Sequence, residues 1–577
     1  AEVYCQDCKG VYIVNSAIAK NVLNSKESGR YGALSFCNVD TVFIYQCNVR
    51  ENSGPTYGGG LYISQVANLL LVNSSFISNK GKNGAAVYIF ECFSVIIKQT
   101  LFMENKATKN GGAIFLISIE NIRFIESQLV HGTALKGAAL YCETCIYFDI
   151  SGSSIMKNKA EYVAGIYVNQ SSSVIIEHTL LLKNTAGHAI SITCFHIFNI
   201  SINNTKLLMS EAEEDYCGFS CKKCRYVYVD NSNFAENHGE LYHFPVYSGV
   251  ITSHGGAISC SDGTQITIKR TLFRENGYIC DGGAVHYKHY SFVIISQTRF
   301  VKNQADCKGA GIYGIHGSYL YVINSTFSHN LVHTAGGGIY ASNVQNITVF
   351  YTNFTGHLSQ NEKDYDFLRS HHTGVGGAVY CDYFVKLIYF AVYFVNNTAT
   401  HYGGASYLEN GVSVEICNCL FTLNTGNHGG ALHVWSIDGL NIVNTHFIKN
   451  HVFQNGGGID VWWSQFKVTN SVFEHNSAKK YGGDISIFRS TLSIISQLVF
   501  IENTGKHGGC IYSYKVYKIN IYNSHLGYCH AQYGGGFYGE SNTVQTILNC
   551  YIIKNKAKMD GGGFYGWEVQ VSVLRNC

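Results

Sequence analysis

Apolar and polar residues alternate along short stretches of this chain and do not follow the spacing of an amphipathic helix. Residues 412–424 (VSVEICNCLFTLN) and 440–450 (LNIVNTHFIKN) are rich in β-branched and aromatic residues. A period of two is typical of strands, whose successive side chains point to opposite faces of a sheet. The pattern therefore predicts a chain of short β-strands.

These stretches recur at a fixed interval. Phe421-x-x-Asn424 is followed by a Gly-Gly-Ala at positions 429–431 and then by Phe447-x-x-Asn450. One unit thus takes about 26 residues, a period typical of solenoid proteins. Similar units extend nearly from end to end, with a spacing that hardly varies. In three units a leucine stands for the Phe and the Asn is replaced: Leu129, Leu208 and Leu526.

A short period of strands and turn glycines predicts an all-β fold, a right-handed parallel β-helix (solenoid) of about 20 turns with repeats of about 26–27 residues. Each turn stacks on the next, so the Phe residues form a column in the core and the Asn residues a hydrogen-bonded column at a bend. The residue before the Asn is often charged, as in Glu51, Glu104 and Lys449, which indicates a solvated face. We expect residues 1–577 to be one continuous segment of a longer protein.

Composition narrows the class of protein. Charged residues make up 14% of the chain and the net charge is +3, with no basic block, so a nucleic-acid partner is not expected. No apolar run approaches the length that a membrane-spanning helix needs, so this portion is expected to hold no transmembrane segment. The 21 cysteines and eight N-glycosylation sequons together indicate a secreted, extracellular or cell-surface glycoprotein. The candidate acceptors are Asn73, Asn169, Asn199, Asn203, Asn324, Asn346, Asn353 and Asn396.

Stacked turns bring equivalent cysteines within reach of disulfide bonding. Cys280 and Cys307 lie one repeat apart, both two positions before the glycine pair, and form the best candidate. Cys550 and Cys577 are also one repeat apart. Three further cysteines share one column on successive turns, and two of them could pair: Cys194, Cys221 and Cys260.

Three Cys-x-x-Cys pairs raise the alternatives of metal or redox chemistry: Cys5/Cys8, Cys142/Cys145 and Cys221/Cys224. Zinc needs four converging ligands, whereas these pairs are turns apart, and a thioredoxin-like site needs a helix after the motif. We therefore expect structural bonding, with no metal and no cofactor.

Two turns are longer than the rest by about half a repeat each, near residues 238–254 and 357–375. Both insertions leave from the same corner, four turns apart, so they could form one aromatic patch that contains histidine. Its members would be Tyr242, His243, Phe244, Tyr247, Tyr365, Phe367, His371 and His372. The alternative is two independent insertions, which repeat proteins tolerate readily.

The pairing of Phe102…Asn105 with Gly112-Ala113-Ile114, and of Phe273…Asn276 with residues 256–258 (Gly-Ala-Ile), resembles the repeat of the chlamydial polymorphic outer-membrane proteins and of similar protist surface proteins. The resemblance covers nearly the whole chain. It implies a surface β-helix used for adhesion, with no catalytic residues to carry over.

The expected function is therefore a non-catalytic extracellular or cell-surface structural and adhesive protein, one form of which would be the protomer of an extracellular filament. Its partners would be other copies of itself, head to tail, or a host or environmental surface or glycan. The alternative is a polysaccharide-binding or polysaccharide-degrading (pectate-lyase-like) enzyme, which needs converging acidic groups. Glu236 and Glu275 come closest to that requirement, while Asp460 and Asp484 occupy different columns.

Overall fold

The computed structural model describes residues 3–22, 32–188, 191–212, 218–239, 255–277, 280–360 and 373–577. The chain forms two compact units. The N-terminal unit comprises Ala1–Cys280 and Ala284–Tyr290, and the C-terminal unit comprises Asp281–Gly283 and Ser291–Cys577. The boundary falls within β32 (Val285–Ser296). One continuous solenoid over 1–577 stays a prediction.

One turn of the chain, called a rung below, contains three strands. In the C-terminal unit, β47 (Leu432–Val443), β48 (His446–Ile448) and β49 (His451–Asn455) make one rung. Each pairs in parallel with its equivalent in the preceding rung: β44 (Ser406–Cys417), β45 (Leu420–Thr422) and β46 (Thr425–His428). The described residues form strands and turns, and they include no helix long and apolar enough to cross a membrane. The predicted parallel β-solenoid of about 20 turns is confirmed.

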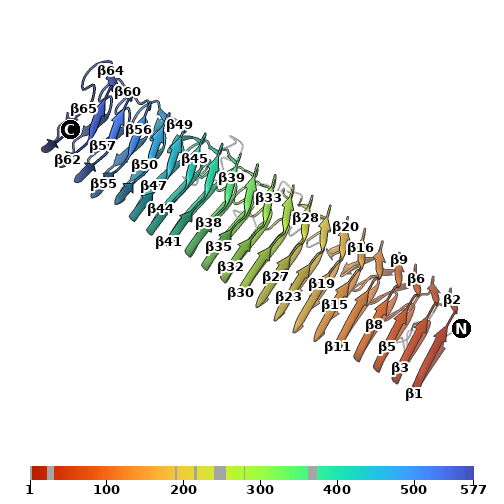
Figure 1. The fold of residues 1–577 in the computed structure, drawn as a ribbon. Coiled ribbons are helices and arrows are strands. Elements are labelled where there is room, and N and C mark those ends of the chain that lie inside the picture. The colour runs from red at the N-terminus through yellow and green to blue at the C-terminus, as the bar shows by residue number, and fades with distance from the viewer. Residues whose placement is uncertain are drawn as a thin grey trace, which may run out of the picture. The chain divides into compact units, whose positions relative to one another are not determined.

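The first strand of each rung is the longest, and within each unit these strands stack side by side (Figure 1). In the N-terminal unit the twelve-residue examples are β1 (Val3–Val14), β3 (Leu34–Tyr45), β5 (Leu61–Val72), β8 (Val87–Lys98), β11 (Ile114–Ile125) and β30 (Ile258–Lys269). In the C-terminal unit they are β35 (Ile312–Ile323), β38 (Ile339–Phe350), β41 (Val379–Phe390), β44 and β47.

Other rungs split this strand in two. The N-terminal unit has β14 (Leu140–Glu143) with β15 (Tyr147–Ser151), β18 (Ile166–Asn169) with β19 (Ser173–Glu177), β22 (Ile192–Phe195) with β23 (Asn199–Asn203), and β26 (Phe219–Lys222) with β27 (Tyr226–Asp230). The C-terminal unit has β50 (Ile459–Trp462) with β51 (Phe466–Thr469), β54 (Ile485–Phe488) with β55 (Leu492–Ser496), β57 (Ile511–Tyr514) with β58 (Lys518–Tyr522), β61 (Phe537–Glu540) with β62 (Val544–Leu548), and β65 (Phe564–Trp567) with β66 (Val571–Arg575).

The Phe residues of the repeat stack inside the core, as predicted. Phe421 and Phe447 are fully buried, and their rings lie 5.0 Å apart at 4° to one another. In the N-terminal unit, Phe76 and Phe102 stack at 5.3 Å. Stacked rings of this size bury roughly 150–250 Å² each, so this column supplies much of the hydrophobic stabilisation.

The Asn residues form the predicted ladder at a bend. The backbone N–H of Asn424 and its Nδ2 both donate to Oδ1 of Asn450, each at 3.0 Å. Asn450 Nδ2 in turn donates to the Phe421 carbonyl at 3.0 Å and to Asn476 Oδ1 at 2.9 Å. Each amide thus satisfies buried backbone groups that the turn would otherwise leave unpaired.

The corners explain the charged column. Each rung turns through residues with left-handed backbone, such as Gly429 (φ 62°), Ser436 (φ 55°), Asn444 (φ 51°) and Lys449 (φ 52°). Lys449 lies directly before the inward-facing Asn450, and a left-handed residue there redirects the chain. Its side chain is exposed, so the predicted solvated face is also a corner of the fold.

Register corrects one anchor of the repeat. Leu207, rather than Leu208, lies opposite Phe234 and is fully buried. Ser210 then occupies the ladder position, where its backbone N–H donates to Asn237 Oδ1 at 3.3 Å. Leu207 and Leu208 are adjacent, and this rung has no Asn at the ladder position. The sequence alone therefore could not show which leucine aligns with the Phe column.

Candidate functional site

The aromatic patch predicted from the two insertions lies outside the described residues. Residues 240–254 and 361–372 contain all eight of its members: Tyr242, His243, Phe244, Tyr247, Tyr365, Phe367, His371 and His372. The patch therefore stays a prediction.

The cysteines form both expected and unexpected bonds. Cys5–Cys8 and Cys142–Cys145 are disulfides, as the structural interpretation of the Cys-x-x-Cys pairs anticipated. Cys510–Cys529 is a disulfide that sequence reasoning missed, because it joins two different columns of one turn. Cys280 and Cys307 are each disulfide-bonded, and their mutual pairing stays a prediction. The thiols of the predicted Cys194, Cys221 and Cys260 column are free.

The predicted bond between Cys550 and Cys577 is not formed, and both thiols are free. Both residues follow an Asn at a corner that in most other rungs holds Ser or Thr. Each Sγ donates to the carbonyl two residues earlier, Cys550 to Leu548 at 3.2 Å and Cys577 to Arg575 at 3.3 Å. Each also approaches a carbonyl of the preceding rung, that of Ile521 at 3.6 Å and that of Ile547 at 3.5 Å, so both thiols are engaged with backbone.

All the sequons except that of Asn346, which lies within β38, are at strand ends and corners. Five acceptor residues are exposed: Asn73, Asn199, Asn324, Asn353 and Asn396. Three are half-buried: Asn169, Asn203 and Asn346. Glycosylation of any of them stays a prediction.

The acidic pair considered for catalysis is neutralised by an arginine. Arg274 Nη2 lies 2.9 Å from Glu236 Oε1, and its Nε lies 3.9 Å from Glu275 Oε2. The same arginine side chain thus engages both carboxylates. Asp484, also considered from the sequence, is buried and accepts a hydrogen bond from Asn476 at 2.8 Å.

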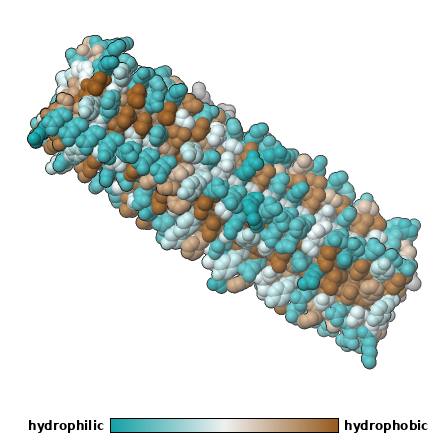
Figure 2. All heavy atoms as spheres, in the orientation of Figure 1, coloured by the Kyte–Doolittle hydropathy of each residue, from teal (hydrophilic) through white to brown (hydrophobic). Residues whose placement is uncertain are grey.

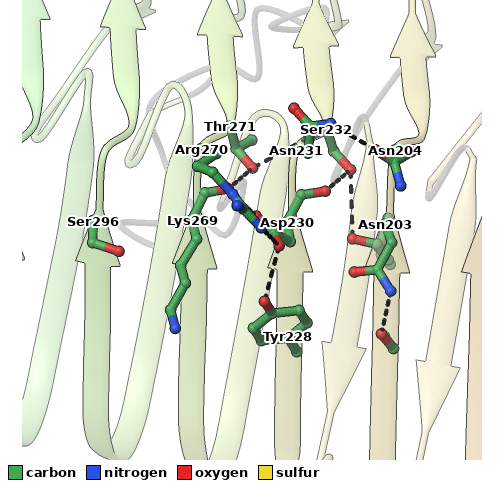
Figure 3. Close-up of polar contacts among 12 residues, drawn as sticks. Asn203, Asn204, Tyr228, Asp230, Asn231, Ser232, Lys269, Arg270, Thr271 and Ser296 are labelled. Carbon is green, nitrogen blue, oxygen red and sulfur yellow. Dashed lines mark hydrogen bonds and ion pairs between the residues drawn. The ribbon is translucent and has the colours of Figure 1, made fainter.

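A second charged cluster of the N-terminal unit was not foreseen (Figure 3). Arg270 donates to both carboxylate oxygens of Asp230, through Nε at 2.9 Å and also through Nη2, while Tyr228 Oη donates to Oδ2 at 3.0 Å. The hydrogen bond from Arg270 holds the pKa of Asp230 below its ordinary value. Fork-to-fork pairing occupies Asp230, so this cluster joins β27 to the rung of β30 rather than offering a base.

A column of stacked aromatic residues runs along the C-terminal unit, with Trp435 exposed, Trp462 and Tyr514 half-buried and Phe488 buried. Trp435, Trp462, Phe488 and Tyr514 are register partners on β47, β50, β54 and β57. The Trp435 and Trp462 rings stack at 5.6 Å, and those of Trp462 and Phe488 at 4.2 Å. Trp435 keeps 36% of its surface exposed. These four residues are called the Trp ridge below.

Both ends of the Trp ridge carry a carboxylate. Glu409 precedes Trp435 in register and accepts a hydrogen bond from Tyr407 Oη at 3.0 Å. Glu540 follows Tyr514 and accepts one from Tyr512 Oη at 2.8 Å. The tyrosines hold both acids in place at the ends of an apolar strip.

A buried polar cluster lies beside the ridge on the same strands. The carboxylate of Asp460 accepts hydrogen bonds from Trp462 Nε1 at 2.9 Å, from Ser486 Oγ and from His433 Nδ1 at 3.0 Å, with His428 Nδ1 3.5 Å away. Burial raises the pKa of Asp460, but the two imidazoles outweigh it and the pKa lies below its ordinary value. Burial lowers the pKa of His433 despite that carboxylate. The cluster fixes the indole of Trp462.

Beyond the corner at Ser436, the same rungs line a shallow depression of about 350 Å³. Its polar lining comes from register partners on successive rungs, Glu415, Asn441 and Lys467, with Gln465 beside them. Lys386 Nζ pairs with Glu415 Oε1 at 3.0 Å. Figure 2 shows apolar and polar residues interspersed over the face in view, and the exposed surface holds many aromatic side chains.

Sequence reasoning missed this face although a signal was present. The chain has four tryptophans, and three lie within residues 435–463. Trp435 and Trp462 are one repeat apart, which is the spacing of register partners. Outward positions were read for charge alone, so an aromatic column among them was not recognised.

Comparison with known proteins adds one match. Residues 99–116 match the Chlamydia polymorphic membrane protein repeat. This stretch contains Phe102, Asn105 and the Gly-Gly-Ala-Ile of residues 111–114, and together with the β-solenoid it shows a repeat protein similar to chlamydial polymorphic membrane proteins. No curated protein and no solved structure matches the chain.

Proposed function

We propose that this chain is a non-catalytic, surface-displayed adhesive scaffold whose C-terminal unit binds carbohydrate on a partner surface. The match to a membrane-protein repeat supports display at a cell surface. One observation carries the binding role: the Trp ridge and the polar depression lie on the same rungs, on either side of the corner at Ser436.

The chemistry of that face suits a polyhydroxylated ligand. Glu415, Asn441, Gln465 and Lys467 supply both donors and acceptors in a shallow site, and sugar hydroxyls can exchange hydrogen bonds with all of them. The exposed edge of Trp435 offers apolar contact for the C–H faces of a sugar ring. Tryptophan is also among the residues that contribute most to binding energy at interfaces.

Catalysis receives less support from the described residues. The three acids examined most closely are engaged: Asp230 by Arg270, Glu236 by Arg274 and Asp460 by two histidines. A glycosidase pair requires one carboxyl group that can donate a proton beside one that remains ionised. Incubation with acidic polysaccharides would detect lyase or hydrolase products, and their formation would overturn the non-catalytic assignment.

Glycan-array binding of the full chain tests the proposal. We expect a subset of glycans to bind, and the double variant Trp435→Ala/Lys467→Ala to weaken that binding about 10- to 100-fold, as loss of a hot-spot residue does. The matched control is Tyr517→Ala, because Tyr517 is an aromatic residue of the same unit that is 66% exposed and lies outside the ridge. Equal binding by wild type and double variant, or binding to proteins but to no glycan, would refute the carbohydrate assignment.

Head-to-tail association into filaments stays a separate prediction. Electron microscopy of the purified chain checks it, since continuous fibres and single particles are readily distinguished.

A further inference from the structure

The N-terminal unit buries four free thiols in one place. Cys194, Cys221, Cys224 and Cys260 come from three successive rungs, on β22, on β26 and the turn after it, and on β30. Cys194, Cys221 and Cys260 are consecutive register partners, and none of the three is more than 2% exposed. Neighbouring strands are about 4.8 Å apart, which lies within the range of Cα separations that disulfides span.

One pair in this cluster is already in close contact. Cys221 Sγ lies 2.7 Å from Cys260 Sγ, closer than two unbonded sulfur atoms pack. The Tyr290 hydroxyl lies 3.6 Å from Cys221 Sγ and also contacts Cys260. Cys221 and Cys260 are therefore oriented for bonding across the two rungs.

Cys224 is the competing partner, because Cys221-x-x-Cys224 occupies the column of the Cys142–Cys145 disulfide. Its thiol contacts that of Cys221 and also lies 3.6 Å from the carbonyls of Cys194 and Lys222. At the position opposite Cys224, the next rung has Gly263, and the ring of Tyr290 fills the space that a side chain there would occupy. Cys224 thus has no thiol opposite it on that rung, whereas Cys221 does.

We propose that Cys221 and Cys260 form a disulfide that joins the rungs of β26 and β30. An external disulfide such as oxidised glutathione serves as the oxidant. The two cysteine thiols lose two protons and two electrons and form one S–S bond, while the glutathione disulfide breaks and leaves as two thiols.

The location gives this bond a role. Register partners on these two rungs are separated by 39 positions in the sequence, against 26 or 27 for most neighbouring rungs, because the first insertion lies between them. The same rungs are joined on the surface by Asp230–Arg270 (Figure 3) and Glu236–Arg274, and inside by Asn237–Asn276. A disulfide here would hold the strands of β26 and β30 in register, where the sequence that connects the two rungs is longer than usual.

Peptide mapping of the full chain tests the proposal. The protein is prepared under oxidising conditions, alkylated while denatured and unreduced, digested with trypsin and analysed by mass spectrometry. Lys222 and Lys223 separate Cys221 from Cys224, so the two possible partners of Cys260 fall in different peptides. A Cys217→Ser background removes the other cysteine of the Cys221 peptide. The disulfides Cys5–Cys8, Cys142–Cys145 and Cys510–Cys529 report that oxidation is complete.

We expect a linked peptide that contains Cys221 and Cys260, with Cys194 and Cys224 alkylated. The variant Cys224→Ala should retain this peptide, and Cys260→Ala should lose it. A Cys221–Cys224 linkage in the parent protein, or alkylation of all four cysteines while the three reference disulfides are intact, would overturn the proposal. Because the parent protein alone decides the outcome, misfolding of a variant does not affect the test.

Discussion

Replacement of Asn450 by alanine tests the asparagine ladder. Asn450 is fully buried, and its loss removes the acceptor of the Asn424 backbone N–H, the acceptor of Asn424 Nδ2 and the donor to the Phe421 carbonyl. Asn424 Nδ2 keeps its hydrogen bond to the Phe394 carbonyl, so two buried groups lose a partner. At about 1–3 kcal/mol for each such group, the predicted loss is about 2–6 kcal/mol. This is large compared with typical substitutions.

Hydrogen exchange followed by mass spectrometry is the suitable assay, because a long solenoid does not unfold in a single two-state step. We expect exchange in peptides that span residues 421–450 to accelerate by about 10- to 10⁴-fold, at tenfold per roughly 1.4 kcal/mol. The ladder also predicts a direction. The amide of Asn424 loses protection, whereas the amide of residue 450 retains its bond to Asn476 Oδ1.

The matched control is Asn444→Gly. Asn444 lies in the same rung but is exposed, and glycine preserves its left-handed backbone (φ 51°). We expect a change within about 0.5 kcal/mol. Equal effects of the two substitutions, or unchanged protection of the Asn424 amide in Asn450→Ala, would refute the ladder as the source of stability.

Three further predictions concern other features of the C-terminal unit. Gly430→Ala should destabilise its rung by about 1–3 kcal/mol, since the new Cβ would lie 2.3 Å from the Gly457 carbonyl oxygen; exchange rates of that rung measure the effect, and wild-type rates would contradict it. Replacing Cys510 and Cys529 by alanine should destabilise the protein by about 3 kcal/mol, because a disulfide that closes a loop of about 20 residues restricts the unfolded chain. The denaturation midpoint should therefore fall. Adding a reductant should not remove any further stability that comes from this disulfide, because the variant lacks it. Burial lowers the pKa of His433, so as pH falls below about 6.5 the unfolded chain binds a proton that the folded chain does not. The stability of its rung should therefore decrease between pH 7 and pH 5, and His433→Phe should flatten that dependence. A rung that became more stable in acid would show that the predicted sign is wrong.

The sequence predicts the fold well because each column repeats one physical role. Phe421 and Phe447 had to stack if the turns stack, and Asn424 and Asn450 had to share a bend. Both relations follow from the period alone. The same logic failed at Leu208, where two adjacent leucines made the frame ambiguous and the structure selects Leu207.

The candidate site was less predictable, because its contacts join different columns. Cys510 and Cys529 have a sequence separation of 19 within one turn, so a search for partners one period apart could not find them. Asp460 contacts Trp462 within a strand and His433 across rungs, which depends on which side chains share the outer face. The repeat period determines which residues are neighbours on successive rungs. The residue types at outward positions do not follow the repeat, so their contacts can be identified only from the structure.

The ladder also bears on how such a chain can change in length during evolution. Asn424 needs only an Asn one rung later, and Asn450 makes the same demand on Asn476. Copying or deleting one whole repeat therefore leaves every remaining amide with a partner, whereas a gain or loss of a few residues within a strand would misalign them all. Duplication of whole rungs is thus the least disruptive route to a longer or shorter protein, with loops at the corners absorbing any other change.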